Sequence, residues 1–179
     1  MFEPIMVRVA QIPGVIWNGS ACTGVHEETF RAILELRQPK AVLEIGTHQG
    51  VSAALLTEYA DTVVTFDVFQ NKTRALVWDL LGCAGKITER VHMAQKVRDT
   101  EIAGAAKISD LAFVDGSHLM NDVALDFRLV TGGGCRRIIM HDYWPSGRSW
   151  PDVKEFVDAL DPSMYSVELH PPFVYVEVL

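Results

Sequence analysis

The sequence lacks the features that mark secreted, membrane-spanning or nucleic-acid-binding proteins. Three cysteines in 179 residues, with no CxxC spacing, argue against a disulfide framework or a zinc site. No apolar run approaches the roughly 20 residues of a membrane-spanning helix, and the first residues do not resemble a signal peptide. The net charge of −7 disfavours binding to phosphate backbones. We therefore expect a cytoplasmic protein that binds a small molecule rather than nucleic acid or a membrane.

Apolar residues make up 49% of the chain, enough for one sizeable core. We expect an N-terminal extension over residues 1–24 and a single domain over residues 25–179. Helical and strand patterns alternate in that domain, which is typical of a parallel α/β sheet. The expected strands are 41–45, 62–67, 90–95, 110–115, 136–142 and a terminal hairpin of 166–170 and 173–179. The expected helices are one from 23 or 24 to 38, then 51–59, one from Asn71 to Gly82, 121–130 and 152–160.

A glycine turn follows the first predicted strand. In the segment VLEIGTHQGVS (42–52), Gly46 and Gly50 stand four residues apart between a buried strand and a helix start. Gly46 allows the backbone to approach a ligand closely, although tight packing alone could also explain it. Thr47 and His48 fill the positions after Gly46, so the dinucleotide pattern GxGxxG is absent. Asp67 ends the second strand, where it can accept hydrogen bonds from a ribose or cap a helix.

These residues resemble the first motif of class I S-adenosylmethionine-dependent methyltransferases, acid-x-Gly-x-x-x-Gly followed by an acid after strand two. The resemblance is greatest to small O-methyltransferases of the catechol and macrolide-sugar type. It implies a doubly wound, mostly parallel, seven-stranded Rossmann-like sheet with a C-terminal antiparallel hairpin. It also implies that Ser52 helps to hold the methionine carboxylate and that Gln95, ending strand three, contacts the adenine. The predicted cofactor residues are Glu44, Gly46, Thr47, His48, Gly50, Ser52, Asp67, Gln95 and Asp115.

Acidic and histidine residues follow the fourth and fifth predicted strands, in D115-G116-S117-H118 and H141-D142-Y143. Carboxyl ends of parallel strands meet at one edge of a sheet, and carboxylate oxygens are ligands that Mg²⁺ prefers. In metal-dependent relatives the corresponding acids bind the ion, which implies a site of Asp115, His141 and Asp142. His141 departs from the usual acid or amide, so Mn²⁺ is an alternative to Mg²⁺. The two acids could also merely cap helices.

His118, three residues after Asp115, is the predicted catalytic residue. The resemblance places a general base there, and an imidazole can remove a hydroxyl proton near neutral pH. The alternative is a histidine with only a structural role.

The loop after the fifth strand carries aromatic residues that could form a wall for a flat acceptor. These are Tyr143, Trp144 and Trp150, with Trp17 in the extension; core packing is the alternative. A homo-oligomer partner could complete the acceptor pocket of so short a chain.

The sequence therefore predicts an S-adenosylmethionine-dependent O-methyltransferase that acts on a small hydroxylated acceptor, with participation of a divalent cation left open. Two alternatives stand beside it: a protein of the same fold with non-methylating metal chemistry, and a cofactor-binding protein without catalysis. A nicotinamide-dependent oxidoreductase is disfavoured by the glycine spacing.

Overall fold

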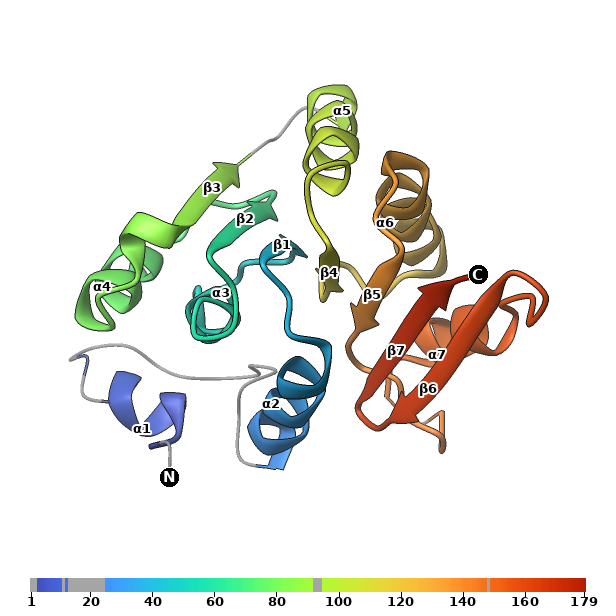
Figure 1. Cartoon of the computed structure of the whole chain (residues 1–179), viewed down its shortest axis with the longest axis horizontal. Coiled ribbons are helices and arrows are strands. Elements are labelled where there is room, and N and C mark those ends of the chain that lie inside the picture. Colours follow the sequence, from blue (N-terminus) through green and yellow to red (C-terminus); the bar gives the residue numbers. More distant parts are fainter. Residues whose placement is uncertain (1–2, 11, 13–24, 92–94, 148) are drawn as a thin grey trace.

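The computed structural model describes residues 3–10, 12, 25–91, 95–147 and 149–179. In this part of the chain, seven strands form one sheet in the order β3-β2-β1-β4-β5-β7-β6 (Figure 1). Strands β1 to β5 run parallel, and β7 is antiparallel to both β5 and β6. The predicted fold is confirmed. The strands are β1 (Ala41–Ile45), β2 (Thr62–Asp67), β3 (Ile87–Val91), β4 (Leu111–Val114), β5 (Arg137–Met140), β6 (Tyr165–His170) and β7 (Phe173–Val178).

Helices cover both faces of the sheet, with α2 and α3 on one side and α5 and α6 on the other (Figure 1). This arrangement is the doubly wound form that parallel strands require. The helices are α1 (Ile5–Val9), α2 (Val25–Arg37), α3 (Val51–Leu56), α4 (Thr73–Leu80), η1 (Ala84–Lys86, 3₁₀), α5 (Gln95–Ala106), α6 (Met120–Gly133) and α7 (Pro151–Asp158).

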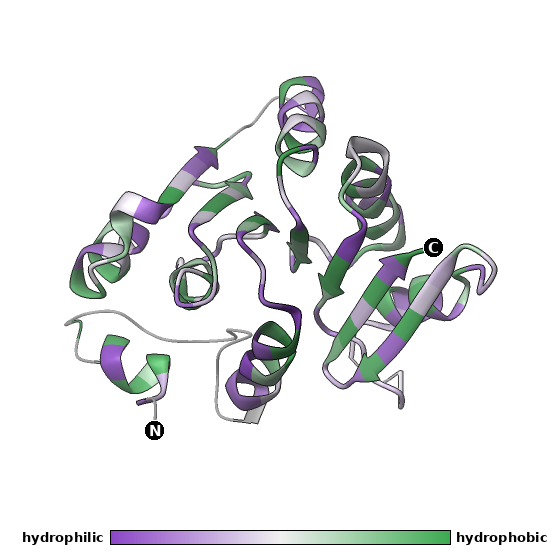
Figure 2. Cartoon of the chain, viewed as in Figure 1, coloured by the Kyte–Doolittle hydropathy of each residue, from purple (hydrophilic) through white to green (hydrophobic). Residues whose placement is uncertain are grey.

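Alternate side chains of the central strands enter two separate cores. In β4, Leu111 and Phe113 pack in the core beneath α2 and α3, while Ala112 and Val114 pack in the core beneath α5 and α6. This follows from the two-residue repeat of a strand. Both faces are buried, so the central strands are almost continuously apolar (Figure 2). Packing on both faces therefore positions their carboxyl ends.

The predicted third strand was wrong in position. The strand β3 spans Ile87–Val91 rather than 90–95, and residues 92–94 lie outside the described part. As an edge strand, β3 tolerates charged residues such as Glu89 and Arg90. Because of these residues, the strand does not appear as an apolar run in the sequence. Gln95 begins helix α5 instead of ending a strand.

Helix α5 was not predicted from the sequence, because the residues that it buries are Ile102 and two small alanines, Ala105 and Ala106. They give a weak helical pattern. Other ends differ by a few residues: α3 stops at Leu56, and α4 begins at Thr73, whose N–H donates to Asn71 Oδ1 at 2.9 Å.

Helix α1 lies within the predicted extension and packs on the domain. Ile5 and Val9 are fully buried in the core that contains Phe30, and the Ile5 N–H donates to Glu27 Oε1 at 2.8 Å. Division of the chain at residue 24 stays a prediction. Among the helices described here, none has the length and apolar character that a membrane span requires.

Candidate active site

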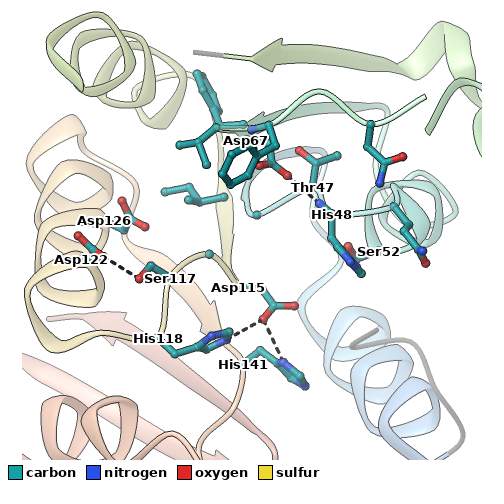
Figure 3. A pocket seen from close by; sticks show the side chains of 18 of the residues that line it. Thr47, His48, Ser52, Asp67, Asp115, Ser117, His118, Asp122, Asp126 and His141 are labelled. Carbon is teal, nitrogen blue, oxygen red and sulfur yellow. Dashed lines mark hydrogen bonds and ion pairs between the residues drawn. The ribbon is translucent and has the colours of Figure 1, made fainter. Parts of the chain in front are cut away.

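A cavity of about 820 Å³ opens at the carboxyl ends of β1, β2, β4 and β5 (Figure 3). Most of the predicted site residues line it: Gly46, Thr47, His48, Ser52, Asp67, Gln95, Asp115, His118, His141 and Asp142. Glu44, within β1, and Gly50, at the end of the turn, are not among its lining residues. The structure thus brings most of the predicted cofactor residues and all of the predicted metal residues to one cavity.

Both glycines of the turn are required by packing within the protein. Gly46 has φ of +100°, and a Cβ there would lie 2.0 Å from the Asp115 carbonyl oxygen. Gly50 has φ of +81°, and its Cβ would lie 2.7 Å from Trp78 Nε1. A side chain is excluded at each position by space as well as by backbone conformation. Tight packing therefore accounts for both glycines, while Gly46 also lines the cavity.

Glu44 is a fully buried acid beneath the turn. It accepts hydrogen bonds from Ser52 Oγ at 2.6 Å and Thr65 Oγ1 at 2.5 Å, and Thr47 Oγ1 lies 2.6 Å from Thr65 Oγ1. Burial raises the pKa of Glu44 from 4.5 to about 7. Because the Ser52 hydroxyl donates its proton to Glu44, it can only accept a hydrogen bond from a ligand in the cavity. Glu44 organises the turn without reaching the ligand space.

We expect Glu44→Gln to reduce the pH dependence of stability. Because the folded pKa of Glu44 is raised, the native protein binds this proton more tightly than the unfolded chain does. The free energy of unfolding therefore falls as pH rises from about 4.5 to about 7, by about 3 kcal/mol from this group. Glutamine removes that contribution. Urea unfolding at pH 5 and pH 8 measures it, with the exposed acid variant Glu28→Gln as control. An unchanged pH dependence in Glu44→Gln would contradict the assignment.

Asp67 at the end of β2 is held by three donors. Its Oδ2 accepts the His48 N–H at 2.9 Å and pairs with Arg74, and its Oδ1 accepts the Phe69 N–H at 3.0 Å. Arg74 is 1% exposed and also pairs with Glu89 at 2.5 Å. No local sequence pattern indicates a role for Arg74, since its partners lie on other elements.

Gln95 lines the cavity, but its side-chain amide donates to Asp99 Oδ1 at 3.0 Å within the same helix. Two further cavity residues were missed by sequence reasoning. Asp126 on α6 is 1% exposed, and Arg98 on α5 donates to it at 2.5 Å. Burial raises the pKa of Asp126, although Arg98 opposes the shift. Nothing in the local sequence indicates that these helices meet.

At the other end of the cavity, Asp115, His118 and His141 converge from the ends of β4 and β5 (Figure 3). Asp142, which also follows β5, contacts both histidines. His118 Nε2 lies 2.8 Å from Asp142 Oδ2 and 3.7 Å from Asp115 Oδ1. His141 Nδ1 lies 3.1 Å from Asp115 Oδ1 and 3.4 Å from Asp142 Oδ2. Ligand atoms of Asp115, His118 and Asp142 all lie within 4.8 Å of one another. This close set contains His118, whereas the predicted metal set contained His141.

The carboxylates and imidazoles of this cluster shift one another's pKa values. Burial lowers the pKa of each histidine, but the two aspartates outweigh it and raise His118 to about 9 and His141 to about 10. Burial raises the pKa of each aspartate, but the histidines outweigh it and hold both below their ordinary value. Ligand-free at neutral pH, the cluster therefore pairs two carboxylates with two imidazolium ions.

Aromatic rings surround the two histidines. The Trp150 indole stacks on the His118 ring with centroids 4.1 Å apart, and Trp150 lines the cavity. His26 on α2 also lines the cavity and contacts the rings of His141 and Trp144. Trp150 thus lines the cavity, and its role as a wall for a flat acceptor stays a prediction. Tyr143 is only 5% exposed and packs in the core instead, and Trp17 lies outside the described residues.

Solved structures of other proteins share this fold. An O-methyltransferase from Bacillus cereus, solved in complex with SAH, has a TM-score of 0.74 at 15% identity over 100% of this chain and 92% of that one. TomG from Streptomyces achromogenes, an O-methyltransferase of tomaymycin synthesis solved with SAM, has a TM-score of 0.67 at 15% identity over 99% and 91%. MycE from the mycinamycin pathway, solved with Mg and SAH, has a TM-score of 0.59 at 17% identity over 97% and 53%. No curated protein matches the chain.

At these identities the structural likeness shows the fold. A family model described as a methyltransferase domain matches residues 43–143, more than half of the chain. The match runs from β1 through the glycine turn to the residues after β5 and so spans the whole predicted site. The chain therefore belongs to the methyltransferase-domain family.

Proposed function

We propose that this protein is an S-adenosylmethionine-dependent O-methyltransferase for a small hydroxylated acceptor, assisted by a divalent cation. One observation carries the proposal: a single cavity is lined by the glycine turn and Asp67 on one side and by Asp115, His118 and Asp142 on the other. Methyl transfer needs a cofactor and an acceptor hydroxyl aligned side by side, with a base at the hydroxyl. The structural relatives solved with SAM or SAH support this cofactor.

The cofactor end of the cavity offers the groups that such a ligand requires. Asp67 is placed to accept a ribose hydroxyl, and the turn from Gly46 to His48 lies beside it, joined by the His48 N–H. Phe69, which follows Asp67 closely and is 73% exposed at the cavity, offers an apolar face for the adenine. These residues would bind and orient the cofactor.

The other end of the cavity fits a divalent cation. Asp115 and Asp142 are ionised, and their oxygens approach the same point as His118 Nε2, a buried atom without a hydrogen-bond partner among the described residues. Although Asp142 Oδ2 is only 2.8 Å away, that nitrogen is not aligned for a hydrogen bond with it. We propose that Asp115, His141 and Asp142 hold Mg²⁺ or Mn²⁺. His141 contributes through the contacts of its Nδ1 with both acids.

His118 is the proposed general base. Its Nε2 faces the two acids and would accept the proton of the acceptor hydroxyl. A bound cation would lower the pKa of that hydroxyl and offset the carboxylate charge that raises the pKa of His118. Trp150, stacked on the imidazole, holds its ring plane and shields one face from water.

Isothermal titration with S-adenosylhomocysteine, with and without Mg²⁺ or Mn²⁺, tests the cofactor and the cation together. We expect micromolar binding, on the order of −8 kcal/mol, and a separate heat from the cation. Asp142→Asn should abolish the cation heat, or weaken cation binding about 10- to 100-fold, and leave the cofactor affinity within about twofold. Asp61→Asn, an exposed acid outside the cavity lining, is the control.

Each result has one meaning. Absence of S-adenosylhomocysteine binding would contradict the proposed cofactor. Cofactor binding with no cation heat would remove the metal from the proposal, and cofactor binding without turnover over a broad set of hydroxylated acceptors would favour a binding protein without catalysis.

A further inference from the structure

Helix α4 directs two buried side chains at the glycine turn. Arg74 Nε donates to the His48 carbonyl at 2.8 Å, and Trp78 Nε1 donates to the Gly50 carbonyl at 2.8 Å. The two side chains share one helix face because they are four residues apart. They are 1% and 7% exposed. Helix α4 therefore fixes the turn from behind at two of its carbonyl groups.

The Arg74 guanidinium also holds the acid of the cofactor end. Its Nη2 pairs with Asp67 Oδ2, and its Nη1 pairs with Glu89 Oε1 on β3 at 2.5 Å. The Nε is the group that binds the His48 carbonyl. One buried side chain thus joins the turn, the end of β2 and the edge strand. Arg74 itself lines the cavity beside Asp67.

The acceptor capacity of Asp67 is largely used within the protein. An ionised carboxylate offers about four acceptor positions, two on each oxygen. Among the described residues, Oδ2 receives the His48 N–H and Arg74, and Oδ1 receives the Phe69 N–H. The Asp67 side chain is 13% exposed and faces the cavity. One acceptor position, on Oδ1, is left for a ligand.

We propose that Arg74 restricts Asp67 to a single ribose hydroxyl, so that the protein recognises only one of the two hydroxyls of the cofactor ribose through this acid. The inference rests on the proposed function, because it takes the ligand to be S-adenosylmethionine or its product. Arg74 is a positioning residue in this scheme, since it acts through Asp67 and the His48 carbonyl. Without Arg74, Oδ2 regains an acceptor position and both hydroxyls can bind.

Titration of the wild-type protein with S-adenosylhomocysteine and with its 2′-deoxy and 3′-deoxy analogues tests the restriction directly. We expect one analogue to lose about tenfold or more in affinity and the other to stay within about twofold of the parent. Equal losses for the two analogues, or no loss for either, would overturn the inference. If the wild type binds S-adenosylhomocysteine and only this discrimination is missing, the proposed function stands. If it binds none, the proposed function fails and the inference fails with it.

Two variants assign the discrimination to Arg74. Arg74→Met keeps the aliphatic length but removes the donors, so the affinities of the two deoxy analogues should become similar. Glu89→Gln removes one ion pair of Arg74 but leaves Asp67 paired, so it should discriminate as the wild type does. Discrimination that persists in a folded Arg74→Met protein would show that Arg74 does not restrict Asp67. Should that variant not fold, the wild-type analogues alone decide the restriction.

Discussion

Replacing His118 by asparagine should lower kcat for methyl transfer about 10²- to 10⁴-fold, the usual contribution of a general base. Asparagine retains a polar side chain next to Asp115 and Asp142 but cannot take a proton from the acceptor. The affinity for S-adenosylhomocysteine should change little, because the turn and Asp67 lie on the other side of the cavity. Steady-state kinetics with an accepted hydroxyl compound, together with titration of the cofactor product, measure both quantities.

The control for this substitution is His170→Asn on the edge strand β6, a half-exposed histidine outside the cavity lining. It should retain full activity.

Cation titration of His118→Asn separates two roles that the geometry allows for this imidazole. Retained cation binding with lost turnover supports a base, whereas loss of cation binding makes His118 a ligand in the cluster with Asp115 and Asp142. Unchanged kcat would remove His118 from the mechanism.

The site residues that could be predicted from the sequence are those at the carboxyl ends of strands. Asp67, Asp115 and Asp142 follow buried runs of β-branched and other apolar residues, and parallel strands place their carboxyl ends at one edge of the sheet. Their meeting in one cavity therefore follows from the strand pattern alone. The choice between His118 and His141 as the histidine nearest both acids depends on ring orientation, which no sequence pattern sets.

Contacts between helices were beyond sequence reasoning. Arg74 meets His48 and Asp67, and Arg98 meets Asp126, only because α4 and α6 pack where they do. In the sequence, a buried arginine cannot be told from a surface arginine, since its partners lie on other elements of the fold. Helix α5 was not predicted for a related reason. Its buried side is made largely of alanine, which packs closely against α6 but gives only a weak helical pattern in the sequence.

Gly46→Ala should destabilise the protein by about 3 kcal/mol or more, a fall in Tm of about 10 °C for a chain of this size. The new Cβ would lie 2.0 Å from the Asp115 carbonyl oxygen, and the φ of +100° is unfavourable for alanine. Relief of the clash requires the ends of β1 and β4 to separate. That movement displaces both the turn and Asp115, so S-adenosylhomocysteine binding should be lost as well. Thermal unfolding and titration measure the two effects.

Gly104→Ala is the matched control for this prediction. Gly104 lies within α5 with nothing within 4 Å of the added Cβ, and alanine is the better helix former. It should raise stability by about 0.5–1 kcal/mol and leave cofactor binding unchanged. The two substitutions add the same methyl group, yet they should change the stability in opposite directions. The comparison therefore separates the local packing at Gly46 from any general effect of a methyl group. If Gly46→Ala were as stable as Gly104→Ala and still bound S-adenosylhomocysteine, the close approach of β1 and β4 would not be what holds the two halves of the site together.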